Sequence, residues 1–146
     1  MGRTRYLLSV KPRFAELLLS GRKTVELRRP KLSIQEGDEL YLYASQPSSA
    51  IVGIVTCKEV VTASPNTLWL KYGDLVGVSR EEFEVYFMGS SSGTALLVNH
   101  PQRLSNPWLL AGLREAVPGF HPPQSHMRVK GSFSVSLGRR KRVAQV

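Results

Sequence analysis

The chain has 146 residues, of which 42% are hydrophobic and 21% charged, as expected for one globular domain with its own core. No apolar run approaches the roughly 18 residues that span a bilayer, and the N-terminal apolar stretch is too short for a signal peptide. We therefore expect a cytoplasmic protein with no membrane partner. Cys57 is the single cysteine, which excludes an intramolecular disulfide and a cysteine-based zinc site, and we expect no metal or cofactor.

The net charge of +9 is unevenly distributed along the chain. Residues 1–31 hold nine Lys/Arg and two Glu, and residues 103–146 hold eight Lys/Arg and one Glu. Residues 32–102, in contrast, hold three Lys/Arg and eight Asp/Glu. If the two basic ends meet in the fold, as chain ends often do, they form one positive face. Such a face is typical of nucleic-acid binding, whereas solubility alone does not require this segregation.

The first part of the chain predicts a strand, a helix and a second strand. Residues 5–10 form a mostly apolar run that is typical of a buried strand. Pro12 begins a helix that Gly21 ends, which is the usual placement of these residues at helix termini. The alternation over residues 24–28 predicts the next strand.

Further elements follow in the acidic middle and the basic C-terminal part. The patterns predict a turn at 36–38, strands at 39–44, 50–61 and 94–98, a short helical segment within 64–73, a capped helix from Ser79, a helix opening at Asn106-Pro107, and a loop at 118–123. Gly53 predicts a bulge or bend in its strand. We assign residues 1–131 to the domain and residues 132–146 to a last strand, 132–137, followed by a mobile basic tail.

The strand at 24–28 is the most informative part of the sequence. Val25 and Leu27 share one parity, while Thr24, Glu26 and Arg28 share the other. One face can therefore join a core while the opposite face presents a hydroxyl, a carboxylate and a guanidinium. That face suits a polar, anionic ligand. The alternative is a surface strand whose Glu26 and Arg28 simply form an ion pair.

The N-terminal residues resemble the entry motif of ASCH domains, a branch of the PUA-like superfamily. The resemblance rests on the pattern Ser9-Val10-Lys11-Pro12-x-Phe14-Ala15-x-Leu17-x-x-Ser20-Gly21-x-Lys23-Thr24-x-Glu26-x-Arg28. The turn at 36–38 and the segment His121-Pro122-Pro123-Gln124-Ser125 resemble a bacterial and archaeal subgroup. The resemblance extends from residue 6 to the region of residue 130.

This resemblance implies an α+β fold, a pseudo-barrel of six mostly antiparallel strands with surrounding helices. It also implies a basic cleft, lined by the second strand and the first helix, that binds RNA, single-stranded nucleic acid or a modified nucleoside. One ASCH branch hydrolyses the acetyl amide of N4-acetylcytidine, and another ASCH protein is described as a ribonuclease. We therefore expect a binding module, with an enzyme using the same cleft, a ribonuclease or an amidohydrolase, as the alternative.

The candidate ligand-binding residues are those of the motif that carry charge or a hydroxyl, namely Lys11, Arg13, Arg22, Lys23, Thr24, Glu26 and Arg28. In an enzyme, Lys23, Glu26 and Thr24 are the catalytic candidates. The sequence departs from the hydrolase pattern Lys-Thr-x-Thr-x-Arg, because Glu26 replaces the second Thr. The distant catalytic Glu of that branch has only Asp74, Glu81 and Glu82 as candidates. This departure favours recognition over amide hydrolysis.

Aromatic and histidine residues leave two interpretations open. Tyr41, Tyr43, Trp69 and Tyr72 either stack on bases or, as such residues more often do, pack in the core or the barrel wall. His121 and His126 either act together in acid–base catalysis or lie in a rigid, proline-rich connector, and we favour the connector.

Overall fold

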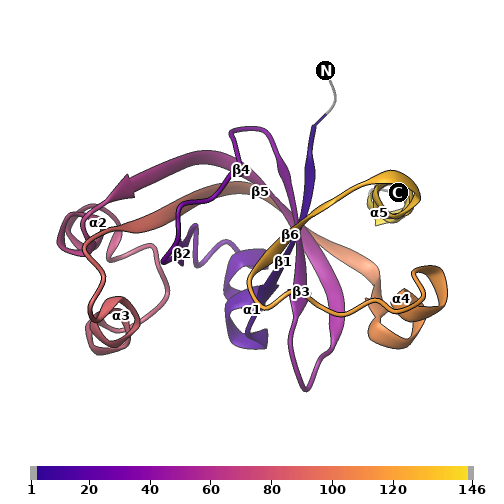
Figure 1. The fold of residues 1–146 in the computed structure, drawn as a ribbon, viewed down its shortest axis with the longest axis horizontal. Coiled ribbons are helices and arrows are strands. Elements are labelled where there is room, and N and C mark those ends of the chain that lie inside the picture. Colours follow the sequence, from indigo (N-terminus) through magenta and orange to yellow (C-terminus); the bar gives the residue numbers. More distant parts are fainter. Residues whose placement is uncertain (1–2, 145–146) are drawn as a thin grey trace.

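The computed structural model describes the backbone of residues 3–144 and the side chains of residues 3–141. Its centre is a curled sheet of six strands, in the order β2-β5-β4-β3-β1-β6 (Figure 1). The strands are β1 (Arg5–Val10), β2 (Val25–Arg28), β3 (Glu39–Ala44), β4 (Ala50–Ala63), β5 (Gly93–Leu109) and β6 (His126–Val129). The helices in the described residues are α1 (Pro12–Leu19), α2 (Pro65–Tyr72), α3 (Arg80–Phe87), α4 (Leu110–Ala116) and α5 (Gly131–Ala144).

The predicted α+β pseudo-barrel of mostly antiparallel strands is confirmed, and its sheet forms a curled half-barrel. Only β1 and β3 pair in parallel among the described strands, and the other four pairings are antiparallel. The long β4–β5 ladder carries three register shifts, and one of them lies between Ile51 and Gly53, where a bulge was predicted. A Cβ at Gly53 would lie 2.8 Å from the carbonyl oxygen of Gln102 and would also collide with Leu19. Glycine at this position therefore lets α1 pack directly on the bend of the sheet.

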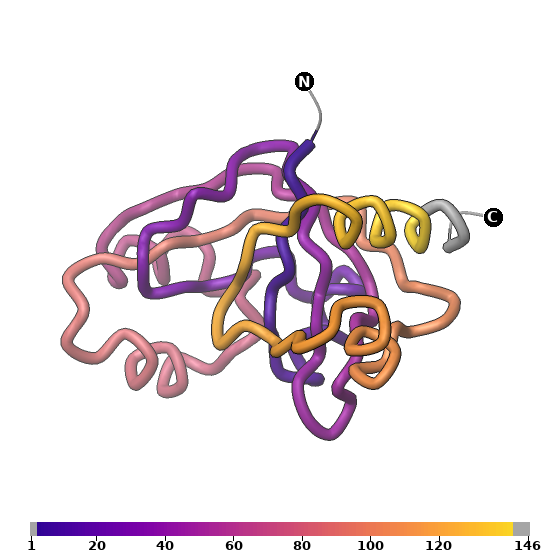
Figure 2. Tube along the Cα trace, turned by 45° about the vertical axis from the view of Figure 1, so that its right-hand side comes forward, coloured from indigo at the N-terminus to yellow at the C-terminus, as the bar shows by residue number. Residues whose placement is uncertain are grey.

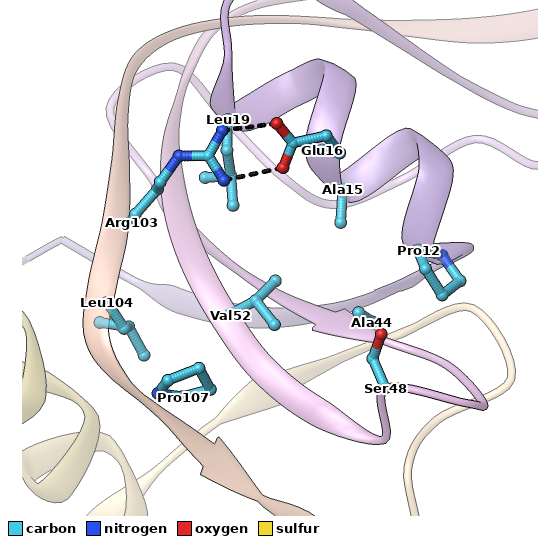
Figure 3. A pocket seen from close by; sticks show the side chains of 10 residues that line it. All are labelled: Pro12, Ala15, Glu16, Leu19, Ala44, Ser48, Val52, Arg103, Leu104 and Pro107. Atoms are coloured by element: carbon cyan, nitrogen blue, oxygen red, sulfur yellow. Dashed lines mark hydrogen bonds and ion pairs between the residues drawn. The ribbon is translucent and has the colours of Figure 1, made fainter.

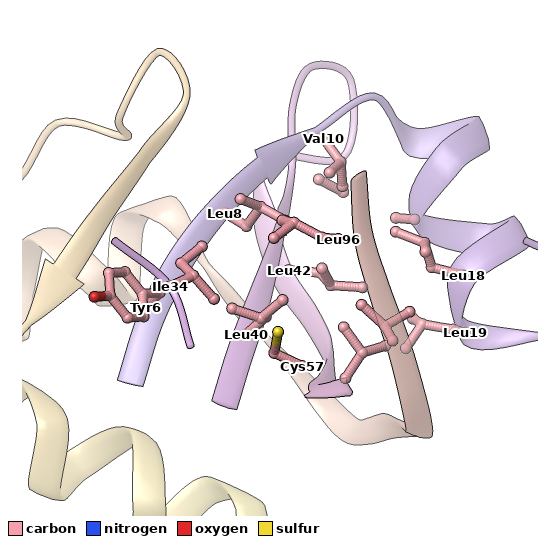
Figure 4. Close-up of a cluster of buried hydrophobic side chains, with 14 of the residues drawn as sticks. Tyr6, Leu8, Val10, Leu18, Leu19, Ile34, Leu40, Leu42, Cys57 and Leu96 are labelled. Atoms are coloured by element: carbon pink, nitrogen blue, oxygen red, sulfur yellow. The ribbon is translucent and has the colours of Figure 1, made fainter. Parts of the chain in front are cut away.

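Buried side chains form three clusters around this sheet. One lies under α1 and includes Leu8, Leu42 and Leu96 (Figure 4). A second lies under α4 and α5, and a third joins β2 and β5 to α2 and α3. The helices thus gather at different parts of the curled sheet (Figure 1), and α1 and α3 both lie near β2.

Two C-terminal predictions are wrong. Residues 132–137 are not a strand, because α5 covers them and continues through the segment predicted as a mobile tail. Phe133 and Leu137 are both buried at helical i, i+4 spacing, whereas Val135 between them is about half exposed. The Ser-X alternation mimicked the period of a strand. Residues 145–146 of the predicted tail lie outside the described residues.

Helix α4 also begins later than predicted. The chain through Asn106-Pro107 is still part of β5, and α4 starts at Leu110 after an extended Leu109. Strand β5 therefore runs well beyond the predicted 94–98. Its pairing with β4 reaches Leu109, opposite Ala50, so the ladder overrides the local helix signal.

The two basic ends of the chain meet around one buried carboxylate. Glu39 is 2% exposed and forms ion pairs with Arg3 at 3.9 Å, Arg5 at 3.1 Å and Lys141 on α5. Strands β1 and β6 pair directly beside this cluster, and Figure 2 shows α5 passing close to the start of β1. The C-terminal segment is therefore held in the fold by charge as well as by Phe133 and Leu137.

Within the described residues, no helix combines the length and the apolar character that crossing a bilayer requires.

Candidate functional site

A cleft of about 920 Å³ opens between α1, α3, β2 and the segment before β6. The lining combines cations, carboxylates, serines and aromatic rings, and it includes five of the seven candidate binding residues: Lys11, Arg13, Lys23, Glu26 and Arg28. The cleft lies on the face of β2 that carries Glu26 and Arg28, as the alternation of residues 24–28 predicted. Val25 and Leu27 pack in the core under α2 and α3, and Glu26 and Arg28 line the cleft, whose lining also includes Leu27.

A buried charge cluster forms one wall of the cleft. Lys23, Glu26 and Arg28 are 2%, 6% and 7% exposed. Nζ of Lys23 lies 3.3 Å from Oε1 of Glu26, and Arg28 donates from Nε and Nη2 to Oε2 of Glu26 at 3.1 and 2.7 Å. The expected Glu26–Arg28 ion pair thus exists, but it is buried and includes a second cation. Burying three charges is expensive, and hydrophobic packing would often be at least as stable, so the cluster points to function.

Lys23 sits deepest in this cluster. Its ammonium also donates to the carbonyl oxygen of Val76 and lies 5.1 Å from the centre of the Phe14 ring. Burial lowers the pKa of Lys23 below its ordinary value, and the neighbouring Glu26 carboxylate opposes that shift. Lys23 thus has almost no exposed surface, and its ammonium is held by Glu26 and Val76.

Arg28 has no N–H left for a ligand. Besides the bonds to Glu26, Nη1 donates to Oγ and to the carbonyl oxygen of Ser125 at 3.1 and 3.3 Å, and Nη2 donates to the carbonyl oxygen of Ser9 at 2.9 Å. A guanidinium has five N–H donors, and these bonds use all of them. Arg28 therefore positions Glu26 and Ser125, and a phosphate could bind it only by displacing one of these contacts.

Ser125 connects the cluster to a histidine. Its Oγ accepts from Arg28 and lies 3.1 Å from Nδ1 of His126. Burial, together with the nearby Arg28 charge, lowers the pKa of His126 below its ordinary value. A neutral imidazole can accept the Ser125 proton at Nδ1, so the pair can take up a proton in the cleft. The two histidines considered as a catalytic pair have different environments: His126 is partly buried beside Ser125, whereas His121 is exposed on the loop.

Exposed cations lie at the rim. Lys11 and Arg29 line the cleft and have no ion pair among the described residues, although the Arg29 guanidinium lies 4.7 Å from the centre of the Tyr86 ring. Arg13 is bound to Glu82 on α3, and this ion pair links the two helices that flank the cleft. Glu81 and Glu82 line the cleft, whereas Asp74 does not belong to its described lining.

Two candidate binding residues, Arg22 and Thr24, are not among the described residues that line the cleft. Arg22 is exposed and donates to the hydroxyl of Ser20. The backbone of Thr24 donates to Leu75 and accepts from Val98, so it anchors the start of β2. The aromatic candidates are part of the packing: Tyr41 and Tyr43 are buried, and Trp69 and Tyr72 pack against the core under α2 and α3.

Several lining residues were not assigned from the sequence. Ser9 lies in the motif that resembles ASCH domains, and Ser125 lies in the segment 121–125 that resembles a subgroup of them. Both resemblances could have identified these serines as lining residues. Tyr86 carried no signal beyond its place on a predicted helix.

A smaller pocket of about 260 Å³ lies beside α1 (Figure 3). Glu16 and Arg103 both line it and form an ion pair, with N···O distances of 2.7 and 2.8 Å. No cluster that could hold a metal ion occurs among the described side chains.

Comparisons with known proteins agree with this fold. A family model described as "Domain of unknown function (DUF365)" matches residues 7–125. A Zymomonas mobilis protein named "ASCH domain-containing ribonuclease" is 35% identical over 127 residues, which are 84% of this chain and 82% of that protein. The chain belongs to the ASCH domain family.

Solved structures support the assignment to the ASCH family. The crystal structure of ASCH from Zymomonas mobilis matches with a TM-score of 0.89 and 30% identity, covering 94% of this chain and 96% of that one. The N-terminal domain of Staphylothermus marinus McrB matches with a TM-score of 0.59 at 12% identity, covering 96% and 98%. The second likeness concerns the fold alone. The ASCH fold was thus identified correctly from the motif of the first helix and β2.

Proposed function

We propose that this ASCH domain binds single-stranded RNA in the cleft and cleaves it there. The observation that carries the proposal is the buried Lys23–Glu26–Arg28 cluster in the wall of a cleft with a basic rim. The name of the Zymomonas mobilis relative, a ribonuclease, supports RNA as the ligand. Binding comes first in this proposal, and cleavage is the additional step that the serine–histidine pair makes chemically feasible.

The rim provides the phosphate contacts. Lys11 and Arg29 are exposed and have no carboxylate partner among the described residues, so their charges are available to a polyanion. Lys23 and Arg28 are buried and occupied, and they hold Glu26 and Ser125 in place instead. Binding should weaken with salt, because each neutralised phosphate releases counterions.

Cleavage would use the hydroxyl at C2′ of the RNA itself. The 2′-hydroxyl passes its proton through Oγ of Ser125 to Nδ1 of His126, and the 2′-oxygen attacks the adjacent phosphorus. The P–O5′ bond breaks and the 5′-oxygen takes up a proton from water. The hydroxide that this leaves is neutralised by the proton that His126 releases to solvent, which restores the neutral imidazole. The products are a 2′,3′-cyclic phosphate and a free 5′-hydroxyl. The geometry that supports this route is the 3.1 Å contact between Ser125 and a histidine whose pKa is lowered.

The amidohydrolase alternative has less support. The hydrolase branch places a nucleophilic Thr where this chain has Glu26, and both oxygens of Glu26 are held by Lys23 and Arg28. A carboxylate in two ion pairs is a poor nucleophile, because attack would require breaking both contacts.

Labelled RNA and a DNA of the same sequence test the proposal. We expect the protein to bind both in low salt but to cleave only the RNA, because only RNA has the 2′-hydroxyl. Ser125→Ala should reduce cleavage by about 100-fold, a typical loss for a group that moves a proton, and should retain binding. Arg22→Gln is the control, because Arg22 is exposed and is not among the described residues that line the cleft. This variant should cleave RNA as the wild type does. Equal cleavage of DNA, or full activity in Ser125→Ala, would contradict the mechanism, and binding without turnover would leave a recognition module.

A further inference from the structure

We infer that RNA extends from the cleft along a basic track formed by residues 29–35, after β2, and residues 126–130, which contain β6. This inference rests on the proposed function and adds the path of the strand outside the cleft. The ligand of the track is single-stranded RNA.

The two segments of the track approach each other at both ends, in each case through residues that flank or bridge them. At the cleft end, Arg28 donates to Ser125, so both segments begin at one junction. At the far end, Tyr6 is the register partner of Arg128 in the β1–β6 pair, and its hydroxyl lies 3.2 Å from Oγ of Ser33.

Every charge on the track is positive. Arg29 and Lys31 come from one segment, Arg128 and Lys130 come from the other, and neither segment contains Asp or Glu. All four are exposed, and none has an ion-pair partner among the described side chains. The cations around Glu39 differ, since they form ion pairs with that carboxylate. A row of exposed, unpaired cations that starts at the cleft fits a phosphate backbone.

The position of the track predicts a dependence on RNA length. Strand β6 lies at the edge of the sheet, and residues 126–130 extend over roughly 16 Å at the rise of a strand. An oligonucleotide that only fills the cleft cannot reach Arg128. A longer strand that occupies the cleft can also contact Lys31 and Arg128.

The experiment measures binding and cleavage of labelled RNA of about four and about sixteen nucleotides, the span of known single-strand site sizes, over a salt series. The test variant is Lys31→Gln/Arg128→Gln. The matched control is Lys58→Gln/Lys71→Gln, which removes two exposed cations outside the track. Both variants change surface side chains, and thermal unfolding verifies that they fold.

We expect the wild-type protein to bind the long RNA more tightly than the short one. The test variant should lose this advantage, and its salt slope on long RNA should fall by about 1.4, at about 0.7 per phosphate contact in a single strand. Binding and cleavage of the short RNA should stay unchanged, and the control should behave as wild type. Equal wild-type affinity for both lengths, or equal losses on both in the test variant, would refute the track and leave the proposed function intact. Failure of the wild type to bind either RNA would refute both.

Discussion

Arg28 donates a hydrogen bond to the hydroxyl of Ser125 at 3.1 Å, across 97 residues of sequence. The contact connects β2, one edge of the curled sheet, to the segment just before β6, the other edge. No backbone ladder joins these two edges among the described strands. Side chains therefore close the half-barrel at this point, and they do so in the wall of the cleft.

Arg28→Lys should be far from conservative. Lysine has three donors on a flexible stem and cannot reproduce five bonds to Glu26, Ser9 and Ser125. We expect a loss of roughly 3 kcal/mol in the free energy of unfolding, as for a broken buried ion pair, together with reduced cleavage. Urea unfolding measures the first effect. Arg29→Lys, at the exposed neighbour, should stay within about 0.5 kcal/mol of wild type, and a similar loss there would argue against this explanation.

Lys23 and Glu26 should show strong energetic coupling. Glu26→Gln leaves two buried cations without their carboxylate, and Lys23→Met leaves Glu26 with one cation. Each single variant should lose roughly 3 kcal/mol in the free energy of unfolding. The double variant should lose less than the sum, by about 1 kcal/mol or more, because the mutual contact can be lost only once. Chemical unfolding of all four proteins gives the coupling, and strictly additive losses would mean that the ion pair contributes nothing.

His126 should make stability depend on pH just below neutrality. Its folded-state pKa is lowered from the ordinary value of about 6.5, so the unfolded chain binds this proton more readily. Stability is therefore greatest above pH of about 6.5 and decreases as the pH falls through that value toward the folded-state pKa. His126→Gln should flatten this part of the profile of melting temperature against pH.

The carboxylates of Glu16 and Glu82 affect the stability of the fold in a lower pH range than His126 does. Ion pairs with Arg103 and Arg13 lower the pKa values of Glu16 and Glu82 below 4.5, so their stabilisation is lost only as the pH falls below that value. The decline near pH 6 should accordingly persist in Glu16→Gln. If His126→Gln leaves that decline intact, another group causes it.

Deleting residues 138–146 should destabilise the fold. The deletion removes the end of α5, where Lys141 pairs with the buried Glu39 and the Arg140 guanidinium lies 3.9 Å from the centre of the Trp108 ring. It leaves Glu39 with Arg3 and Arg5 alone, and we expect a loss of about 2 kcal/mol or more, measured by thermal unfolding. Replacing only the exposed Arg139 by Gln should have little effect. Full stability after the deletion would mean that the contacts of Arg140 and Lys141 contribute nothing to the stability of the fold.

The order of elements through α3 followed from local patterns. Pro12 and Gly21 delimit α1, the parity of Val25 and Leu27 orients β2, and the Ser79 capping box begins α3. Each of these signals acts within a few residues, where backbone preferences and hydrophobic period decide the structure. The prediction was wrong where two periods competed. Phe133, Val135 and Leu137 fit a strand, but burial of Phe133 and Leu137 on one helix face decided the outcome.

The sequence by itself determined that residues 11–28 gather several cations and carboxylates along the first helix and β2, where charge, alternation and the motif coincide. Only the tertiary structure decided which of these residues are buried and which partners they contact. Lys23 and Arg28 look like ligand contacts in the sequence, but packing buries them and directs their donors to Val76, Glu26, Ser9 and Ser125. The physical reason is that burial and partner choice depend on segments far away in the chain, and no local pattern records those contacts.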